Sequence, residues 1–221
     1  DDPNTQPNEA APDVVNGFLT APTEIAPTSP VVTSATDIAK LPDEDRPLSV
    51  NNLTVNEGSP FAVFTVTGVV DQYVKLSLAD GTAKVDANGT PVTDGTEDYG
   101  PNLEYFDGAD WQPYTAGSFV KIPNGGTTLL VRTTIVNDVP ADNGQTFTLT
   151  ATNTGNSNAV GTATIYDDGT GTLFTSGNPV NGAPATVTVA TGAVVTSGTL
   201  PNDDRALSVN NVTVNEASPY I

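Results

Sequence analysis

Carboxylate side chains are the groups in this sequence that are best equipped for chemistry. The chain holds 26 Asp and Glu residues against 7 Lys and Arg, and it has no Cys and no His. Lack of Cys excludes a disulfide framework and thiolate metal sites. Lack of His removes the commonest general base and transition-metal ligand. Carboxylates bind hard cations: calcium takes roughly six to eight oxygen ligands in flexible geometry, whereas magnesium keeps its waters and needs an octahedron.

The acids gather where predicted strands begin or end. Aspartate favours turns, so any one of these residues alone is explained by a turn or a solvated strand end. As a set they predict calcium, because strand ends of a sandwich meet at its poles and only Arg46 and Arg205 are near enough to neutralise them. The set comprises Asp43, Glu44 and Asp45 before the first strand, Glu57 after it, Asp138 and Asp142 after a long strand, Asp167 and Asp168 after the last strand, and Asp203 and Asp204 before the next one.

The net charge of −19 limits the classes of partner. Nothing in the chain neutralises phosphates, which disfavours nucleic acids and anionic membranes. So acidic a surface repels itself and destabilises the compact state, and bound divalent cations would relieve this. A solvated acidic face is the alternative interpretation of the charge alone. No apolar run of about 18 residues predicts a membrane span, and the start at Asp1 indicates an internal fragment without a signal peptide.

Segments of alternating hydrophobicity predict the elements that position the acids. Abundant Thr, Asn, Gly and Val favour strands and turns over helices. The first strand, 48–55, is interrupted at Asn51-Asn52, which predicts a bulge or a step. Short strands at roughly 8–15-residue spacing predict an all-β fold, an antiparallel two-sheet β-sandwich of immunoglobulin-like topology, with a barrel as the alternative. The other predicted strands are 61–66, 73–78, 82–85, 103–106, 111–114, 119–122, 127–136, 146–151 and 160–166.

A repeated stretch sets the domain organisation. Residues 41–62 and 200–221 are displaced by 159 positions and are identical at 15 of 22. A period of that size fits a whole domain in a tandem array. Within the flanking linkers we expect local pairing at 31–33 and a small hairpin in 185–199 around Thr191-Gly192. The predicted parts are an extended acidic Pro-rich linker over 1–46, the sandwich over 47–168, a second linker over 169–205, and the first strand of a truncated next repeat over 206–221.

Four motifs follow one another along the chain in this order: VNNLTVNEGSPFAVFTVTG, TEDYG, IVNDVPADNGQTFTLTATN and GTATIYDDGTG. Together they resemble the Calx-β domain, and most closely the Calx-β-like repeats of very large bacterial surface adhesins, many secreted with RTX-type C-termini. The resemblance covers about residues 45–170, with 200–221 as a truncated second copy. It implies a calcium-binding sandwich. The ligands it implies are Glu57, Asp138, Asp142, Asp167 and Asp168, with Asp98 as a weaker candidate.

Two positions depart from the family pattern. Gln145 stands where Glu is usual, and Asn137 stands where an acid is common. Both changes remove charge, so the resemblance implies fewer ions or weaker binding there.

The candidate mechanism is mechanical: calcium bridges neighbouring units. Asp167 and Asp168 of one unit would meet acids of the next, and the linker between Asp168 and Asp203 would have to fold back for this. Otherwise the two acidic pairs occupy separate sites. The expected partners are Asp203, Asp204 and Glu216, and the equivalent set on the N-terminal side is Asp43, Asp45 and Glu57.

The leading hypothesis is a structural, calcium-stiffened extender module of a secreted adhesin or fibre on a bacterial cell surface, with neighbouring identical repeats or chains as partners. One alternative is a subunit of a self-assembling extracellular filament or layer, in which 207–221 or the strand-like linker completes a neighbour's sheet. Another is a carbohydrate- or surface-binding module around Trp111 and Tyr114, together with Tyr105 and Phe106, although such residues more often fill a core. Without His or a nearby Lys no nucleophile is activated, and we expect no enzyme activity.

Overall fold

The computed structural model describes residues 14–15, 18–19, 31–39, 41–86, 97–123, 126–138, 140–189, 194 and 199–220. Its elements are short and, apart from one turn of helix, all strands. In chain order they are β1 Val14–Val15, β2 Phe18–Leu19, β3 Val31–Val32, α1 Ala35–Ile38, β4 Ser49–Val50, β5 Leu53–Asn56, β6 Phe61–Thr67, β7 Tyr73–Asp80, β8 Glu104–Phe106, β9 Trp111–Pro113, β10 Phe119–Lys121, β11 Thr128–Thr134, β12 Gln145–Asn153 and β13 Asn158–Tyr166.

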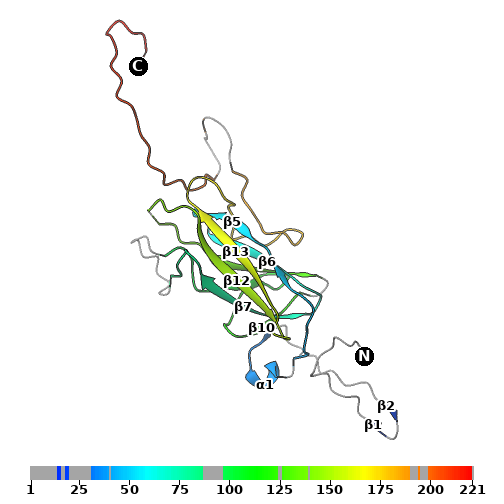
Figure 1. The fold of residues 1–221 in the computed structure, drawn as a ribbon. Helices are drawn as coiled ribbons and strands as arrows, with labels where there is room; N and C mark the ends of the chain where they lie inside the picture. The colour runs from blue at the N-terminus through cyan, green and yellow to red at the C-terminus, as the bar shows by residue number, and fades with distance from the viewer. Residues whose placement is uncertain are drawn as a thin grey trace.

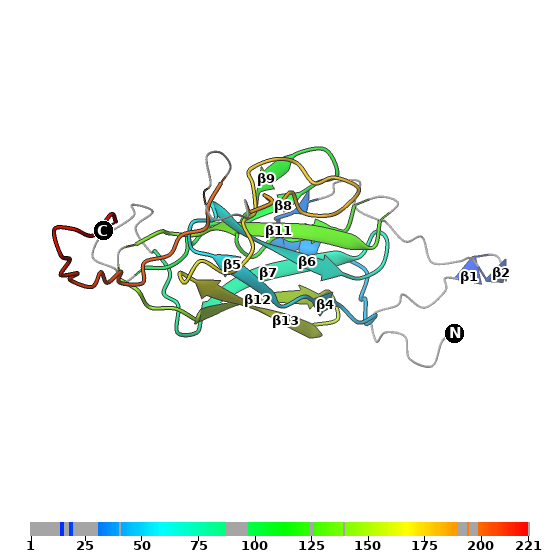
Figure 2. The same cartoon turned by 90° about the horizontal axis from the view of Figure 1, so that it is seen from above.

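Two sheets face each other, and their layers are seen edge-on in Figure 2. The larger sheet has the strand order β3-β10-β7-β12-β13-β5, and the smaller has the order β4-β6-β11-β8-β9. All pairings are antiparallel except that of β5 with β13. The predicted two-sheet sandwich is therefore confirmed. Of the predicted strands, 82–85 contributes an isolated bridge between Val85 and Tyr99.

Alternation along β12 and β13 shows why these residues form strands. In β12, Phe147, Leu149 and Ala151 are buried and the intervening threonines are half-buried. β-Branched threonines suit the outer surface of a sheet. One of them, Thr148, pairs directly with Thr162 of β13. This cross-strand pairing keeps the register in which every second side chain enters the core.

The step predicted in the first strand is a switch between sheets. β4 pairs with β6 of the smaller sheet, and β5 pairs with β13 of the larger one. Between them, the Asn51 side chain accepts a hydrogen bond from the Thr65 amide at 2.6 Å, and the Asn52 side chain accepts one from the Thr162 amide at 2.8 Å. Each asparagine thus satisfies a backbone donor of one sheet where the strand itself leaves the ladder.

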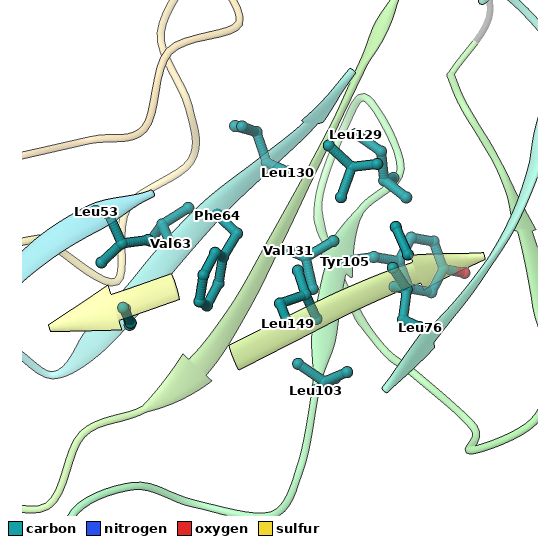
Figure 3. Close-up of a cluster of buried hydrophobic side chains, with 14 of the residues drawn as sticks. Leu53, Val63, Phe64, Leu76, Leu103, Tyr105, Leu129, Leu130, Val131 and Leu149 are labelled. Atoms are coloured by element: carbon teal, nitrogen blue, oxygen red, sulfur yellow. The ribbon is translucent and has the colours of Figure 1, made fainter. Parts of the chain in front are cut away.

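The core lies between the sheets and is largely aromatic and aliphatic (Figure 3). The Phe147 ring stacks on Tyr99 with 4.1 Å between centroids and meets Phe64 edge-on at 5.8 Å. The Tyr99 hydroxyl donates to the Asp80 carboxylate at 2.6 Å, which satisfies the one polar atom of this ring. Aliphatic side chains from both sheets fill the rest, among them Leu76, Leu149 and Val131.

Parts of both expected linkers pack on the sandwich. Val31 and Val32 form β3 and extend the larger sheet beside β10. After β13 the chain turns back, and Leu173 and Phe174 are 2% and 6% exposed. The Ser59 hydroxyl accepts from the Phe174 amide at 2.9 Å. The hairpin predicted around Thr191-Gly192 lies outside the described residues.

Among the described residues there is one helix, α1, which is one turn long, and the Ser34 side chain caps it by accepting from the Asp37 amide. In the part of the chain that is described, no helix has the length and apolar character needed to span a bilayer.

Candidate metal centre

Strand direction explains why several acids meet at one end of the sandwich. β5 runs parallel to β13, with Asn56 opposite Tyr166, so the residues that follow both strands leave from the same end. β12 runs antiparallel to β13 and starts at that end, so the loop before it arrives there too. This end, which we call the upper pole, carries Glu57, Asp138, Asp142 and Asp167. The C-terminal tail leaves from the end opposite α1 (Figure 1).

The first acidic cluster consists of Glu57, Asp167 and Asp204. One carboxylate oxygen of each lies within 4.8 Å of the others. Asp204 reaches the cluster because its amide donates to the Asp167 carbonyl at 3.0 Å, and Gly169 donates to the Asn202 carbonyl at 2.9 Å. These two bonds flank a bridge between Asp168 and Asp203. The linker therefore does fold back, as one of the two expected arrangements requires.

The side-chain amides of Asn56, which is buried, and Asn202, which is half-buried, hold this cluster together. The Asn56 side chain donates to the carbonyls of Tyr166, Thr170 and Asn202 at 2.8–3.2 Å and accepts from the Asn202 amide at 2.8 Å. The Asn202 side chain in turn donates to Glu57 at 3.1 Å and to Asp204 at 3.3 Å. Neutral donors thus partly satisfy the carboxylates without a cation.

The second cluster consists of Asp98, Asp138 and Asp142, again with one oxygen of each within 4.8 Å of the others. Asp98 directly precedes Tyr99, which bridges Ile135 just after β11, and its carboxylate accepts from the Lys84 amide at 2.6 Å. The clusters adjoin, because the Asp138 amide donates to Glu57 at 2.8 Å and the Asp142 amide donates to Asp167 at 3.0 Å. The six acids therefore form one continuous group at the upper pole.

Three carboxylate oxygens in this group are buried without a partner. Both oxygens of Asp138 and the Oδ1 of Asp167 make no hydrogen bond to any described residue. Asp138 is 7% exposed and Asp167 is 2% exposed. Among the described residues, no Lys or Arg forms an ion pair with any of the six acids. A buried, unpaired carboxylate is costly, so these oxygens need a cation or a proton.

The pKa values reflect this need. Burial, followed by the charges of Asp138 and Asp167, raises the pKa of Glu57 from 4.5 to about 7. Burial, followed by the charges of Asp142 and Asp98, raises the pKa of Asp138 from 3.8 to about 6. Burial also raises the pKa of Asp98 and of Asp142. All four shifts arise because the folded chain on its own disfavours the charged form.

The remaining predicted ligands belong to neither cluster. Asp168 and Asp203 sit beside the first cluster, but Asp203 pairs with Arg205 at 2.6 Å and Asp168 accepts from Thr170 and Asn143. Asp43 and Asp45 lie next to Gly155, in the turn between β12 and β13 at the opposite end of β13 from Glu57. The structure therefore does not place Asp43 and Asp45 beside Glu57, although these three residues were expected to form the N-terminal set. Glu216 is exposed in the C-terminal tail and joins neither cluster.

The two departures from the family pattern take part as neutral groups. The Gln145 side chain donates to the Asp142 carboxylate at 2.6 Å, and the Asn137 side chain accepts from Asn202 at 3.4 Å. Asn56 and Asn202 were missed by sequence reasoning. Their only signal is position, since one precedes Glu57 in the NEG motif and the other replaces Asp43 in the second copy of the repeat.

The Trp111 ring, considered above as a carbohydrate-binding surface, is covered by other side chains of the same chain. The Arg132 guanidinium lies 4.1 Å from the Trp111 ring and 4.0 Å from the Phe61 ring, and it pairs with Glu104 at 2.6 Å. The indole N–H donates to the Gly177 carbonyl at 3.4 Å. These contacts anchor the β8–β9 hairpin and the loop after β13, so the ring serves packing here.

Comparison with known proteins gives a distant likeness in fold. No protein-family model matches the sequence, and no curated protein matches it. Among solved structures, the chain is similar to CBD12 from CALX1.2, at 17% identity and a TM-score of 0.36, over 55% of this chain and 45% of that one. It is also similar to the apo form of the Calx CBD1 domain, at 17% identity and a TM-score of 0.34, over 55% of this chain and 97% of that one. The likeness to Calx-β domains is found at this distant level, and the two-sheet sandwich rests on the strand pairing.

Proposed function

We propose that the chain is a structural module that binds calcium at the upper pole, within a secreted adhesin or extracellular fibre of a bacterial cell surface. The observation that carries the proposal is the set of buried, unpartnered carboxylate oxygens of Asp138 and Asp167. They belong to two adjoining groups of three acids. Calcium bound there would supply the missing positive charge.

The donor set fits calcium better than other metals. Each cluster offers three carboxylates. The sequence has no thiolate or imidazole to favour zinc or copper. The clusters are assembled from separate loops and a returning linker, which suits the flexible coordination of calcium more than the strict octahedron of magnesium.

The location of the clusters supports a structural role. Asp204 comes from the returning segment, whereas Glu57 and Asp167 come from the sandwich, so a shared ion would tie the segment to the domain. For the same reason we propose no enzyme activity: the acids stand at a pole, where they hold segments together.

Calcium titration tests the proposal. Isothermal titration calorimetry of the chelator-treated chain is expected to show calcium binding, with little heat for magnesium at equal concentration. Asp138→Asn and Asp167→Asn are each expected to remove or weaken binding, and Glu216→Gln, an exposed acid outside both clusters, is expected to leave it unchanged. Absence of calcium binding, or equal binding by all three variants and the parent, would contradict the proposal.

A self-assembling filament subunit is the second candidate. It is favoured by the exposed apolar side chains of the tail, since Leu207 and Val209 are 98% and 93% exposed. An unpaired segment of this kind can add to a sheet of another chain. Light scattering over a range of protein concentrations tests this. The average molar mass will rise with concentration for a filament subunit and will stay constant for a module that remains monomeric.

A further inference from the structure

The two copies of one hexapeptide contact opposite ends of the sandwich. Residues 41–46 read LPDEDR and residues 200–205 read LPNDDR. The second copy lies on the upper pole, beside Asp167 and Gly169. The first copy lies on the turn between β12 and β13, which we call the lower pole. There the Thr154 hydroxyl donates to the Pro42 carbonyl at 2.6 Å.

Both copies share the same local conformation. In the first copy, the Arg46 backbone amide and guanidinium both contact the carboxylate of Glu44. In the second copy, the Arg205 amide and guanidinium contact the carboxylate of Asp203 in the same way. The conformation is thus a property of the hexapeptide and does not depend on which pole it contacts.

The two poles bind the backbone groups of different residues of the hexapeptide. At the lower pole, the contacts use the carbonyls of its second, fourth and sixth residues: Pro42 accepts from Thr154, Glu44 from the Gly155 amide at 3.3 Å, and Arg46 from Gln72 at 2.8 Å and Asn153 at 3.1 Å.

At the upper pole, the contacts use the third and fifth residues. Asn202 engages Asn56 and Gly169 through its backbone amide and carbonyl, and the Asp204 amide donates to Asp167. Along an extended chain, backbone groups of successive residues point to alternate sides. One hexapeptide can therefore make both sets of contacts at once.

We propose that the hexapeptide is a two-sided junction, held between the upper pole of one unit and the lower pole of the next. Its partner is a second copy of this unit. In the first copy, Asp43 and Asp45 would present their backbone groups to the upper pole of a preceding unit. In the second copy, residues 208–215 would form β4 and β5 of a following unit. Leu207 and Val209, now exposed, correspond to Leu48 and Val50 of this unit.

This junction predicts a fixed angle between units where a Pro-rich linker alone would predict a flexible one. It rests on hydrogen bonds of the chain and does not depend on the calcium proposal. Calcium at Glu57, Asp167 and Asp204 would reinforce the same contact, because Asp204 belongs to the hexapeptide.

A two-unit protein tests the junction. Residue 221 corresponds to residue 62, so the whole chain can be continued from residue 63 of a second copy in register. The sequence has no Cys, so Val160→Cys in both units gives two spin labels on exposed positions. Electron–electron double resonance is expected to give one narrow distance distribution. Insertion of Gly-Ser-Gly between Arg205 and Ala206 should broaden it, because the hexapeptide then stays on the first unit alone.

A matched pair of substitutions locates the lower-pole contact. A side chain at Gly155 would meet the Asp45 carboxylate, and its Cβ would lie 3.0 Å from the Glu44 carbonyl. Gly155→Val in the second unit should therefore broaden the distribution, whereas the same change in the first unit should leave it narrow. A broad distribution in the parent, or a narrow one after the insertion, would overturn the proposal, and neither result depends on whether calcium binds.

A second test needs only one 221-residue chain with two substitutions. Asn202→Asp with Asp203→Glu turns residues 200–205 into a copy of 41–46. If the copies are interchangeable, the amides of Gly169 and Asp204 will stay protected from hydrogen exchange in saturating calcium. Fast exchange at these two amides in an otherwise protected sandwich would show that the copies are not equivalent, and would also overturn the proposal.

Discussion

Replacing Asp138 by Asn separates the charge of this side chain from its shape. Asp138 is 7% exposed, and neither carboxylate oxygen has a partner among the described residues. Its pKa is raised from 3.8 to about 6, first by burial and then by the charges of Asp142 and Asp98. Each pKa unit corresponds to about 1.4 kcal/mol, so the ionised group costs the calcium-free folded state roughly 2–3 kcal/mol well above that pKa. Asp138→Asn removes this cost.

In calcium the sign of the effect reverses. Asp138 then donates its oxygens to the cation, and the amide of Asn is a weaker ligand without charge. A ligand at about 100 times its Kd stabilises the folded state by about 2.7 kcal/mol. We therefore expect Asp138→Asn to be more stable than the parent by roughly 1–3 kcal/mol in chelator, and less stable by roughly 1–3 kcal/mol in calcium.

Urea unfolding at a mildly alkaline pH, followed by the fluorescence of Trp111, measures both values. Glu216→Gln is the control, because it removes one negative charge from an exposed residue outside both clusters. Its unfolding free energy should equal that of the parent in both buffers. The reasoning is refuted if calcium does not change the stability of the parent, or if Asp138→Asn shifts stability in the same direction with and without calcium.

Three further outcomes follow from the same contacts. In chelator, the parent should melt at a higher temperature near pH 5 than near pH 8. The pKa values of Glu57 and Asp138 are raised to about 7 and about 6, so the folded state loses stability as the pH rises through that range. Saturating calcium should abolish or reverse this trend. Arg132→Ala should lower the unfolding free energy by about 2–4 kcal/mol in urea titrations and shift the emission of Trp111, because Arg132 is 7% exposed and its guanidinium stacks on that ring. Asn56→Ala should lower the unfolding free energy by about 2–4 kcal/mol and weaken calcium binding in calorimetry, because it removes the side-chain donor to the Thr170 carbonyl and the acceptor of the Gly58 and Asn202 amides.

The strands could be predicted because their signal is local. Alternating Phe147, Leu149 and Ala151 against threonines identify β12 within nine residues of sequence. The interruption at Asn51-Asn52 likewise predicts a break, since asparagine side chains replace backbone ladder bonds. That the break moves the chain to the other sheet depends on Thr65 and Thr162, which no local pattern connects to it.

The candidate site was predicted only in part because proximity depends on strand direction. Glu57 and Asp167 meet since β5 is parallel to β13, a pairing between residues more than 100 positions apart. Asp43 and Asp45 carry the same signal in the sequence, yet they reach the other pole because β4 begins there. Leu173 and Phe174 fall within the linker predicted from residue 169, yet both side chains are buried. Their burial and the backbone hydrogen bonds of Thr172 with Thr54 and Asn56 hold the returning chain on the sandwich.

The difference between the two hexapeptides connects charge to assembly. The third residue is Asn202 in one copy and Asp43 in the other. As Asn, it donates to Glu57 and Asp204 and so partly neutralises the upper pole without a cation. As Asp, it can donate no side-chain hydrogen bond and would add a negative charge beside those of a preceding unit. A junction built with Asp43 would therefore need calcium more than the one built with Asn202, so consecutive junctions in such an array would differ in calcium dependence while sharing one backbone geometry.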